Sequence, residues 1–134
     1  MAPTIVSAMK QRLLLLAPLA LAGCVTTPAQ GDSALVYARI GQTVTVGGPR
    51  VTPLALLEDS RCPQGVQCVW AGQVRITARV ATAGGSSVRE LTSGKPIAVA
   101  DGTMTLADIE PAKDKDTPIA PGTYRFGFRF DEGL

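Results

Sequence analysis

Apolar and polar side chains alternate most regularly in the middle of this chain. In Gln73–Val80, two valines, an isoleucine and an alanine would share one face of a strand, and two arginines and a threonine the other. An alternation of period two is typical of a strand with one buried face and one face in water. This segment is the clearest strand that the sequence predicts, and its apolar face is a candidate for the core.

Shorter β-prone runs lie on both sides of this segment, separated by glycine, proline and aspartate. Gly84-Gly85 and Asp101-Gly102 are typical of two-residue hairpin turns. Pro53 cannot donate a hydrogen bond to a neighbouring strand, so its own strand is expected at an edge or beside a bulge. The further predicted strands are Leu35–Ile40, Thr43–Val46, Val51–Leu57, Ser87–Leu91, Lys95–Ala100 and Thr103–Leu106.

Gly122–Phe130 is the last expected strand and carries all three phenylalanines of the protein. Tyr124 and these phenylalanines alternate with other residues, so they would lie on one face. An aromatic stripe of period two is most simply a core face, and we expect it to oppose the apolar face of Gln73–Val80. A surface on which a ligand stacks is the alternative.

No segment after Cys24 has the length and amphipathic period of a helix. Ala107–Ala120 is expected to be one long irregular segment, because its prolines exclude a stable helix. The expected fold is all-β, a small antiparallel β-sandwich, immunoglobulin-like or related, of about seven or eight strands, with a small barrel as the alternative. We assign residues 34–131 to this domain and residues 132–134 to a tail.

The beginning of the chain has the features of a targeting signal. Lys10 and Arg12 precede Leu13–Ala22, an apolar run that is too short to span a bilayer. Leu21-Ala22-Gly23-Cys24 follows, and it resembles the lipobox of bacterial lipoproteins.

The lipobox resemblance implies that residues 1–23 are a signal peptide and that Cys24 carries a lipid anchor. Residues 24–33 would then be a lipidated tether to the domain. Val25 is not the aspartate that commonly retains such proteins in the inner membrane, so the resemblance implies the outer membrane, facing the periplasm. An ordinary secretory signal with a chance cysteine is the alternative.

Charge and composition argue against several functions. Without Lys10 and Arg12 the chain carries as many basic as acidic residues, so no basic patch predicts binding to nucleic acid. Histidine, the commonest general base, is absent from the sequence. Glu58 and Asp59 are adjacent, so on a strand they would point to opposite faces and could not act as a catalytic pair. We expect neither an enzyme nor a bound cofactor or metal.

Cys62 and Cys68 flank a segment that contains Pro63 and Gly65. These two residue types favour a tight turn, which would bring the thiols together. A redox pair usually has two intervening residues, and zinc needs four ligands. Because exported proteins fold in an oxidising compartment, a static disulfide is the favoured interpretation and a redox or metal pair the alternative.

The segment around these cysteines also resembles a known signature. Glu58-Asp59-Ser60-Arg61-Cys62-Pro63, and then Val66-Gln67-Cys68-Val69-Trp70-Ala71-Gly72 before a strand, is similar to a motif of small bacterial secreted proteins and lipoproteins. That family is widespread and largely uncharacterised. The resemblance implies a small exported β protein and no particular activity.

Two further features each allow two interpretations. Trp70 could be an exposed binding residue, but a tryptophan beside a disulfide more often covers the bridge, and we favour that packing. Lys113-Asp114-Lys115-Asp116 could be a calcium loop, but each lysine would lie beside the ion. A solvated charged loop is therefore favoured there.

These features predict a lipid-anchored, non-enzymatic protein of the cell envelope that presents a disulfide-constrained loop to an unidentified envelope protein or ligand. An inhibitor of a periplasmic enzyme, with the loop inserted in the target's cleft, is the alternative. In either case a rigid loop loses little conformational entropy on binding. The candidate recognition residues are Glu58, Asp59, Arg61, Gln64, Val66, Gln67 and Trp70.

Overall fold

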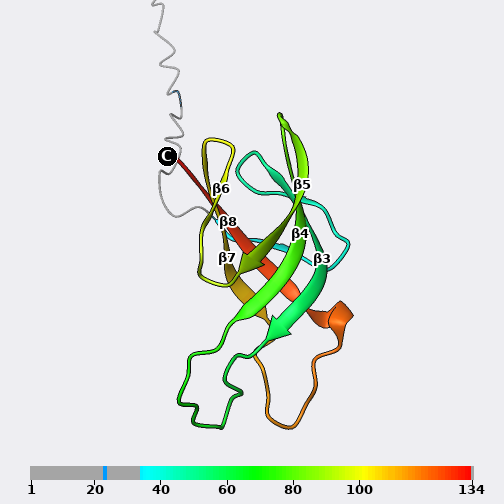
Figure 1. The fold of residues 1–134 in the computed structure, drawn as a ribbon, viewed down its shortest axis with the longest axis vertical. Coiled ribbons are helices and arrows are strands. Elements are labelled where there is room, and N and C mark those ends of the chain that lie inside the picture. Colours follow the sequence, from blue (N-terminus) through cyan, green and yellow to red (C-terminus); the bar gives the residue numbers. More distant parts are fainter. Residues whose placement is uncertain (1–22, 24–33, 134) are drawn as a thin grey trace, which may run out of the picture. The chain divides into compact units, whose positions relative to one another are not determined.

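The computed structural model of this chain describes Gly23 and residues 34–133. Eight strands form two antiparallel sheets, ordered β2-β3-β4-β5 and β1-β8-β7-β6, so the expected all-β sandwich is confirmed (Figure 1). Cys24, residues 1–22 and the predicted tether lie outside the described residues. The elements are β1 (Val36–Ala38), β2 (Val44–Thr45), β3 (Arg50–Asp59), β4 (Val74–Thr82), β5 (Gly85–Thr92), β6 (Ile97–Val99), β7 (Gly102–Glu110), a 3-10 turn η1 (Pro121–Thr123) and β8 (Arg125–Glu132).

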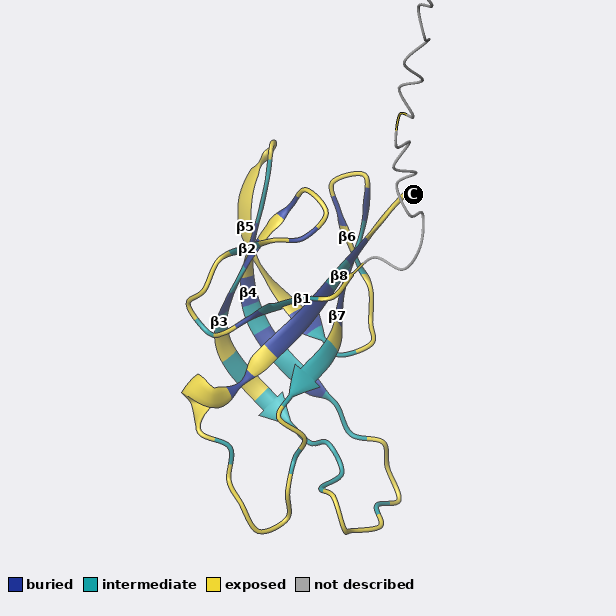
Figure 2. Cartoon of the chain, turned by 180° about the vertical axis from the view of Figure 1, so that it is seen from behind, coloured by how far each residue is buried: buried dark blue, intermediate teal, exposed yellow. Residues whose placement is uncertain are grey.

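The core lies between the two sheets and is built from the predicted apolar faces (Figure 2). The alternate residues of β4 that were expected to be buried are buried, and so are the aromatic residues of β8. All of them belong to one cluster, so the prediction that these two faces oppose each other is confirmed, and the aromatic stripe is core. The residues concerned are Val74, Ile76, Ala78, Val80, Tyr124, Phe126, Phe128 and Phe130.

Both predicted hairpins are present, β4–β5 and β6–β7, but each turn lies one residue earlier than the glycine signals predict. Gly85 and Gly102 are instead the first residues of β5 and β7. At Gly102 the reason is packing, because a Cβ there would collide with the Asp131 carbonyl and the Phe130 ring. Glycine is thus required by a close approach, and the turn itself is formed by Ala100-Asp101.

The prediction that Ala107–Ala120 is irregular throughout is wrong for its first residues. β7 continues to Glu110, past a bulge between Leu106 and Asp108. The extra residue at the bulge shifts the alternation of buried and exposed positions, and this shift hid the rest of the strand.

Pro53 lies in β3, which is an inner strand of its sheet. The pairing of β3 with β4 shifts between Pro53 and Ala55, so of the two expected explanations the bulge is the correct one. At the other end of the chain, β8 extends through Glu132, a residue that was assigned to the tail.

The two long loops lie side by side at one end of the sandwich, at the bottom of Figure 1. Residues 60–73 join β3 to β4 and contain the disulfide, and residues 111–120 lead from β7 to η1. Gln64 and Asp114 form a backbone bridge between them. We call residues 60–73 and 111–120 together the loop end. The hairpin turns lie at the opposite end (Figure 1).

Candidate functional site

The disulfide loop is closed at its base as well as at its cysteines. Cys62 and Cys68 are bonded, with Cα atoms 5.9 Å apart, so the predicted disulfide is confirmed. At the base, the Ser60 amide donates to the Gln73 carbonyl at 2.9 Å, and the Gln73 amide donates to Ser60 Oγ at 3.0 Å. Gly72, with φ at +68°, lies so close to the Ser60 carbonyl that a Cβ would collide with it. The loop is therefore held in shape at two levels.

Asp59, the last residue of β3, links the base of the loop to the other sheet. Its side chain is 7% exposed, and it accepts hydrogen bonds from Arg61 Nε at 2.8 Å and Nη2 at 2.9 Å. It also accepts one from the Tyr124 hydroxyl at 2.8 Å, and Tyr124 directly precedes β8. The Arg61 amide donates to the same carboxylate at 3.3 Å. Asp59 and Arg61 are thus bonded to each other through their side chains and through the loop backbone.

The protonation states of this cluster follow from its contacts. Burial disfavours the charged form of Asp59, but the hydrogen bonds from Arg61 and Tyr124 outweigh it and hold the pKa of this carboxyl below its ordinary value. Burial and the hydrogen bond to Asp59 raise the pKa of Tyr124 to about 12. At neutral pH, Asp59 and Arg61 are thus a charged pair beside a neutral tyrosine.

Arg61 and Lys113 fasten the second loop to the first. Arg61 Nη1 donates to the Ile109 carbonyl at 3.1 Å, and Nη2 to the Pro111 carbonyl at 3.2 Å. Lys113 Nζ donates to the Asp59 carbonyl at 2.8 Å, while the Lys113 carbonyl accepts from the Gln64 amide at 2.8 Å. Both loops are therefore bonded to each other and to the ends of the two sheets.

The favoured interpretation of Lys113-Asp114-Lys115-Asp116 needs a correction. Residues 114–116 are exposed as expected, but Lys113 is half-buried and bonded to the first loop. Asp114 Oδ1 accepts from the Asp116 amide at 2.8 Å, which is a contact within the loop. In the described part of the chain, no group of three or more acidic, cysteine or histidine residues could hold a metal ion.

The tip of the disulfide loop is apolar and exposed. Val66 is 44% exposed, Val69 94% and Trp70 62%, so the interpretation that Trp70 covers the disulfide is wrong. The physical reason lies at the end of the core, which Tyr124 closes by stacking on Phe126 with ring centroids 5.7 Å apart. The aromatic side chain at this end of the core is therefore Tyr124, and Trp70 stays in solvent.

The candidate recognition residues divide into two groups. Those at the base are bonded within the domain: Glu58 accepts from Arg75 Nε at 2.7 Å and from Gln73 Nε2 at 3.0 Å, and Asp59 and Arg61 bond to each other. Glu58 and Asp59 thus have separate partners, as expected from their opposite directions on β3. The exposed candidates are Gln64, Val66, Gln67 and Trp70.

Val69 was missed by the sequence analysis, although it is the most exposed large hydrophobic residue of the described domain. The available signal was its place in the uncharged run between Arg61 and Arg75. A long run without charge in a surface loop is unusual, and within it the apolar residues next to Trp70 were candidates as well.

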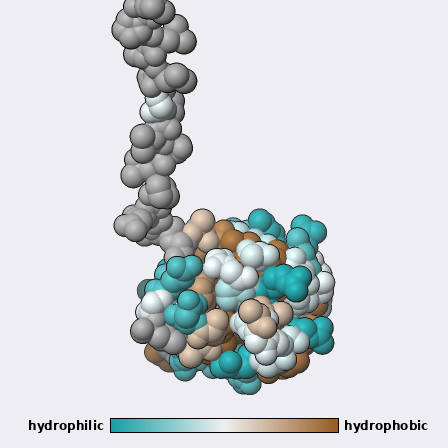
Figure 3. All heavy atoms as spheres, turned by 90° about the horizontal axis from the view of Figure 1, so that it is seen from above, coloured by the Kyte–Doolittle hydropathy of each residue, from teal (hydrophilic) through white to brown (hydrophobic). Residues whose placement is uncertain are grey.

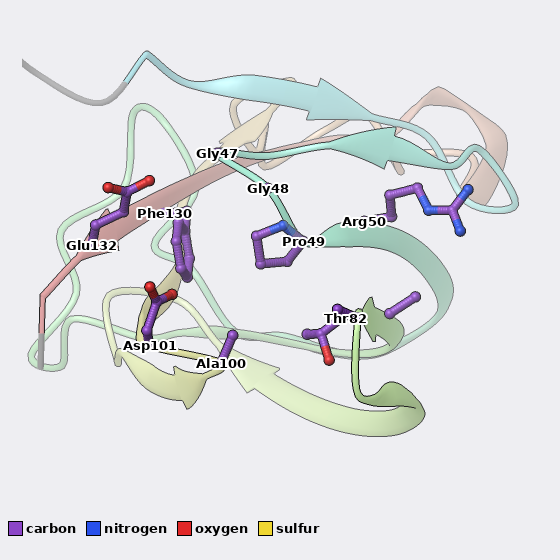
Figure 4. A pocket seen from close by; sticks show the side chains of 11 residues that line it. Gly47, Gly48, Pro49, Arg50, Thr82, Ala100, Asp101, Phe130 and Glu132 are labelled. Carbon is purple, nitrogen blue, oxygen red and sulfur yellow. The ribbon is translucent and has the colours of Figure 1, made fainter.

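A hollow of about 520 Å³ opens at the opposite end of the sandwich (Figure 4). Its floor is the Phe130 ring, which fits between Gly47 and Gly102 because a Cβ at either glycine would collide with it. Asp101 and Glu132 lie at its rim. Figure 3, which views this end, shows hydrophilic residues spread around small hydrophobic areas. The loop end, with its clustered apolar tip, is the stronger candidate for a functional site.

No protein-family model, no curated protein and no solved structure matches this chain significantly. Of the residues that the structure describes, none forms a helix long and apolar enough to cross a membrane. The geometry of the loop end is therefore the basis for its function.

Proposed function

We propose that this chain is a non-enzymatic module of the bacterial cell envelope, anchored by a lipid at Cys24, whose loop end binds another envelope protein. The observation that carries this proposal is the uncharged tip of the disulfide loop. Val66, Val69 and Trp70 are exposed there, while the charged residues at the base are bonded within the domain.

The tip has the properties of a preformed binding surface. Of the six exposed large hydrophobic residues in the described domain, three fall within residues 66–70. Burying such a side chain in a partner contributes roughly 1.5–3 kcal/mol, and tryptophan is among the commonest anchors of protein interfaces. Because the loop is closed at the disulfide and at its base, it loses little conformational entropy on binding.

A protein partner fits the loop end better than a lipid surface does. The exposed carboxylate residue Asp114 lies beside Gln64 in the backbone bridge between the loops, with Asp116 close in sequence. A tip inserted in a bilayer would bring the Asp114 carboxylate and the Lys115–Asp116 ion pair to the membrane, which costs free energy. A partner protein can cover the apolar tip and leave the carboxylates in water at the rim of the interface.

The direction of β1 supports the proposed anchoring. Val36 pairs with Phe128 and Ala38 with Phe126, in antiparallel register. β1 therefore begins on the side of the later residues of β8, away from the loop end, because β8 starts beside Asp59 and runs from there. A tether attached on that side would leave the loop end free to meet a partner.

An inhibitor of a periplasmic enzyme is the second candidate function. The disulfide loop projects beyond the ends of the sheets, at the bottom of Figure 1, and its exposed tip is suited to enter a cleft. The same residues would then act, with an enzyme as the partner. An assay of protease inhibition separates the two candidate functions.

The experiment is a comparison of proteins that co-purify with the tagged full chain from native envelopes. Val69→Ser with Trp70→Ser is expected to lose the partner, because the two substitutions remove the most exposed apolar side chains of the tip. Leu35→Ser is the matched control, since Leu35 is 40% exposed and lies outside the loop end. The proposal is contradicted if all three chains retain the same proteins. If the unaltered chain inhibits an envelope protease and the chain with Val69→Ser and Trp70→Ser does not, the result favours the inhibitor function.

A further inference from the structure

The outer edge of β5 is a second surface prepared for an interaction. β5 is the last strand of its sheet, and no strand of the described part of the chain pairs with its outer edge. It pairs with β4 over its full eight residues without a bulge, and it contains no proline. Residues Gly85–Glu90 are all exposed. A long, regular and uncovered edge is a template on which another strand can add.

The register of the hairpin shows which backbone groups face outward. Thr82 and Gly85 flank a two-residue turn, and such a turn closes on a hydrogen-bonded pair. Because bonded and non-bonded pairs alternate along an antiparallel ladder, the N–H and C=O groups of Ser86, Val88 and Glu90 point away from β4. The usable edge ends at Thr92, whose carbonyl accepts from the Lys95 amide at 3.0 Å.

We propose that this edge pairs with the same edge of a second copy of the chain, antiparallel and centred on Val88. In this register Val88 lies opposite Val88 of the other copy, Ser87 opposite Arg89, and Ser86 opposite Glu90. The outward groups of each copy meet those of the other, and no two like charges are directly opposed. The edge is therefore complementary to itself.

Alternative registers are poorer. Residues whose N–H and C=O groups face outward must pair with each other, so the centre of the pair can move only by one whole residue at a time along the strand. One step centres the pair on Arg89 and sets two guanidinium groups opposite each other, which is destabilising. The step in the other direction places Glu90 opposite the Ala83-Gly84 turn, so that it loses its partner strand. Only the register centred on Val88 both keeps Glu90 opposite a residue of the partner strand and avoids opposing two arginines.

The proposed contact also covers an exposed apolar residue. Val88 is 57% exposed at the middle of the edge, and strand pairing would shield it against its equivalent. Arg89 reaches toward the other sheet, with Nη1 donating to the Ala98 carbonyl at 3.5 Å. The pairing uses one strand edge and leaves the loop end uncovered, so it does not depend on the proposed function.

Cysteines added one at a time to the full chain, and oxidised in native membranes, test the register. Directly opposed residues on antiparallel strands have Cα atoms about 5.5 Å apart in hydrogen-bonded pairs such as Val88 with Val88, and about 4.5 Å apart in non-bonded pairs such as Ser87 with Arg89; a disulfide can span either. Val88→Cys is expected to give a disulfide-linked dimer, and Ser87→Cys or Arg89→Cys alone is not. Co-expressed Ser87→Cys and Arg89→Cys chains are expected to crosslink to each other. Leu57→Cys controls for random collisions, because Leu57 is 46% exposed but lies on the inner strand β3. Equal crosslinking from Val88→Cys and Leu57→Cys overturns the proposal.

Charge substitutions at the same position give an independent test. Val88→Lys or Val88→Glu alone opposes two like charges at the centre of the pair, so two differently tagged copies should no longer capture each other. Co-expression of the Lys and Glu variants should restore capture, since opposite charges then face each other. Val88→Thr should capture normally. Retained capture by Val88→Lys alone, with melting unchanged, would overturn the proposal.

Discussion

At the scale of single residues, Asp59 and Trp70 lie in environments opposite to those that their side chains suggest. The carboxylate is nearly buried and the indole is exposed. The carboxylate is stabilised because Arg61 presents a two-pronged donor and Tyr124 a hydroxyl. Tyr124 in turn is buried at the end of the core, where it stacks on Phe126.

We expect Asp59→Asn to lower the free energy of unfolding by about 2–3 kcal/mol, because it removes an anionic acceptor and leaves a mostly buried Arg61 without its counter-charge. Glu58→Gln is the matched control. Its ion pair with Arg75 has side chains that are 34% and 35% exposed, and ion pairs this open to water contribute little to stability. Denaturant unfolding of both variants at neutral pH measures the difference. Equal losses would show that Asp59 has no special role.

The same comparison extends to acid. Because the pKa of Asp59 is lower in the folded chain than in the unfolded chain, ionisation of Asp59 stabilises the fold above its unfolded pKa. This contribution is lost as the pH falls through the folded pKa. Below about pH 4 the unaltered chain should therefore lose more stability than Asp59→Asn does. Parallel curves would contradict the assignment.

At the scale of elements, regular alternation was enough to predict β4, β8 and the pairing of their faces. It failed in β7, where the bulge after Leu106 shifts the pattern by one residue. The glycine signals placed both hairpin turns one residue late, and at the second turn Gly102 is required by its contact with Phe130 and not by the turn. Glycine in a sequence marks a constraint, but the constraint can be a close approach of two strands.

β8 is the element on which the core depends most, and Phe128 is its central side chain, fully buried. Phe128→Ala is expected to cost about 3–5 kcal/mol, because the cavity left behind cannot be refilled by a rigid sheet. That is a large part of the stability of a small domain. Leu57→Ala, at an exposed position, should change the free energy of unfolding by less than about 0.5 kcal/mol. A thermal unfolding midpoint that is unchanged in Phe128→Ala would contradict the described core.

At the scale of the whole molecule, the two ends of the sandwich differ in kind. One end joins two loops from different sheets into a single unit through Asp59, Arg61 and Lys113. The other end carries short hairpin turns and an open hollow above Phe130. The disulfide and the base of its loop were predictable, because the residues involved are near in sequence. The contacts of Asp59 with Tyr124 and Lys113 were not, since they join segments that only the folded sandwich brings together.

The central claim is that the tip of the disulfide loop contacts a partner protein in the envelope. The most direct measurement places a photoreactive amino acid at position 70 of the full chain and irradiates living cells. A second chain carries it at position 35, which is exposed but lies outside the loop end. We predict a discrete crosslinked protein from position 70 that is absent from position 35. No crosslinked protein from position 70, or the same products from both positions, would contradict the account.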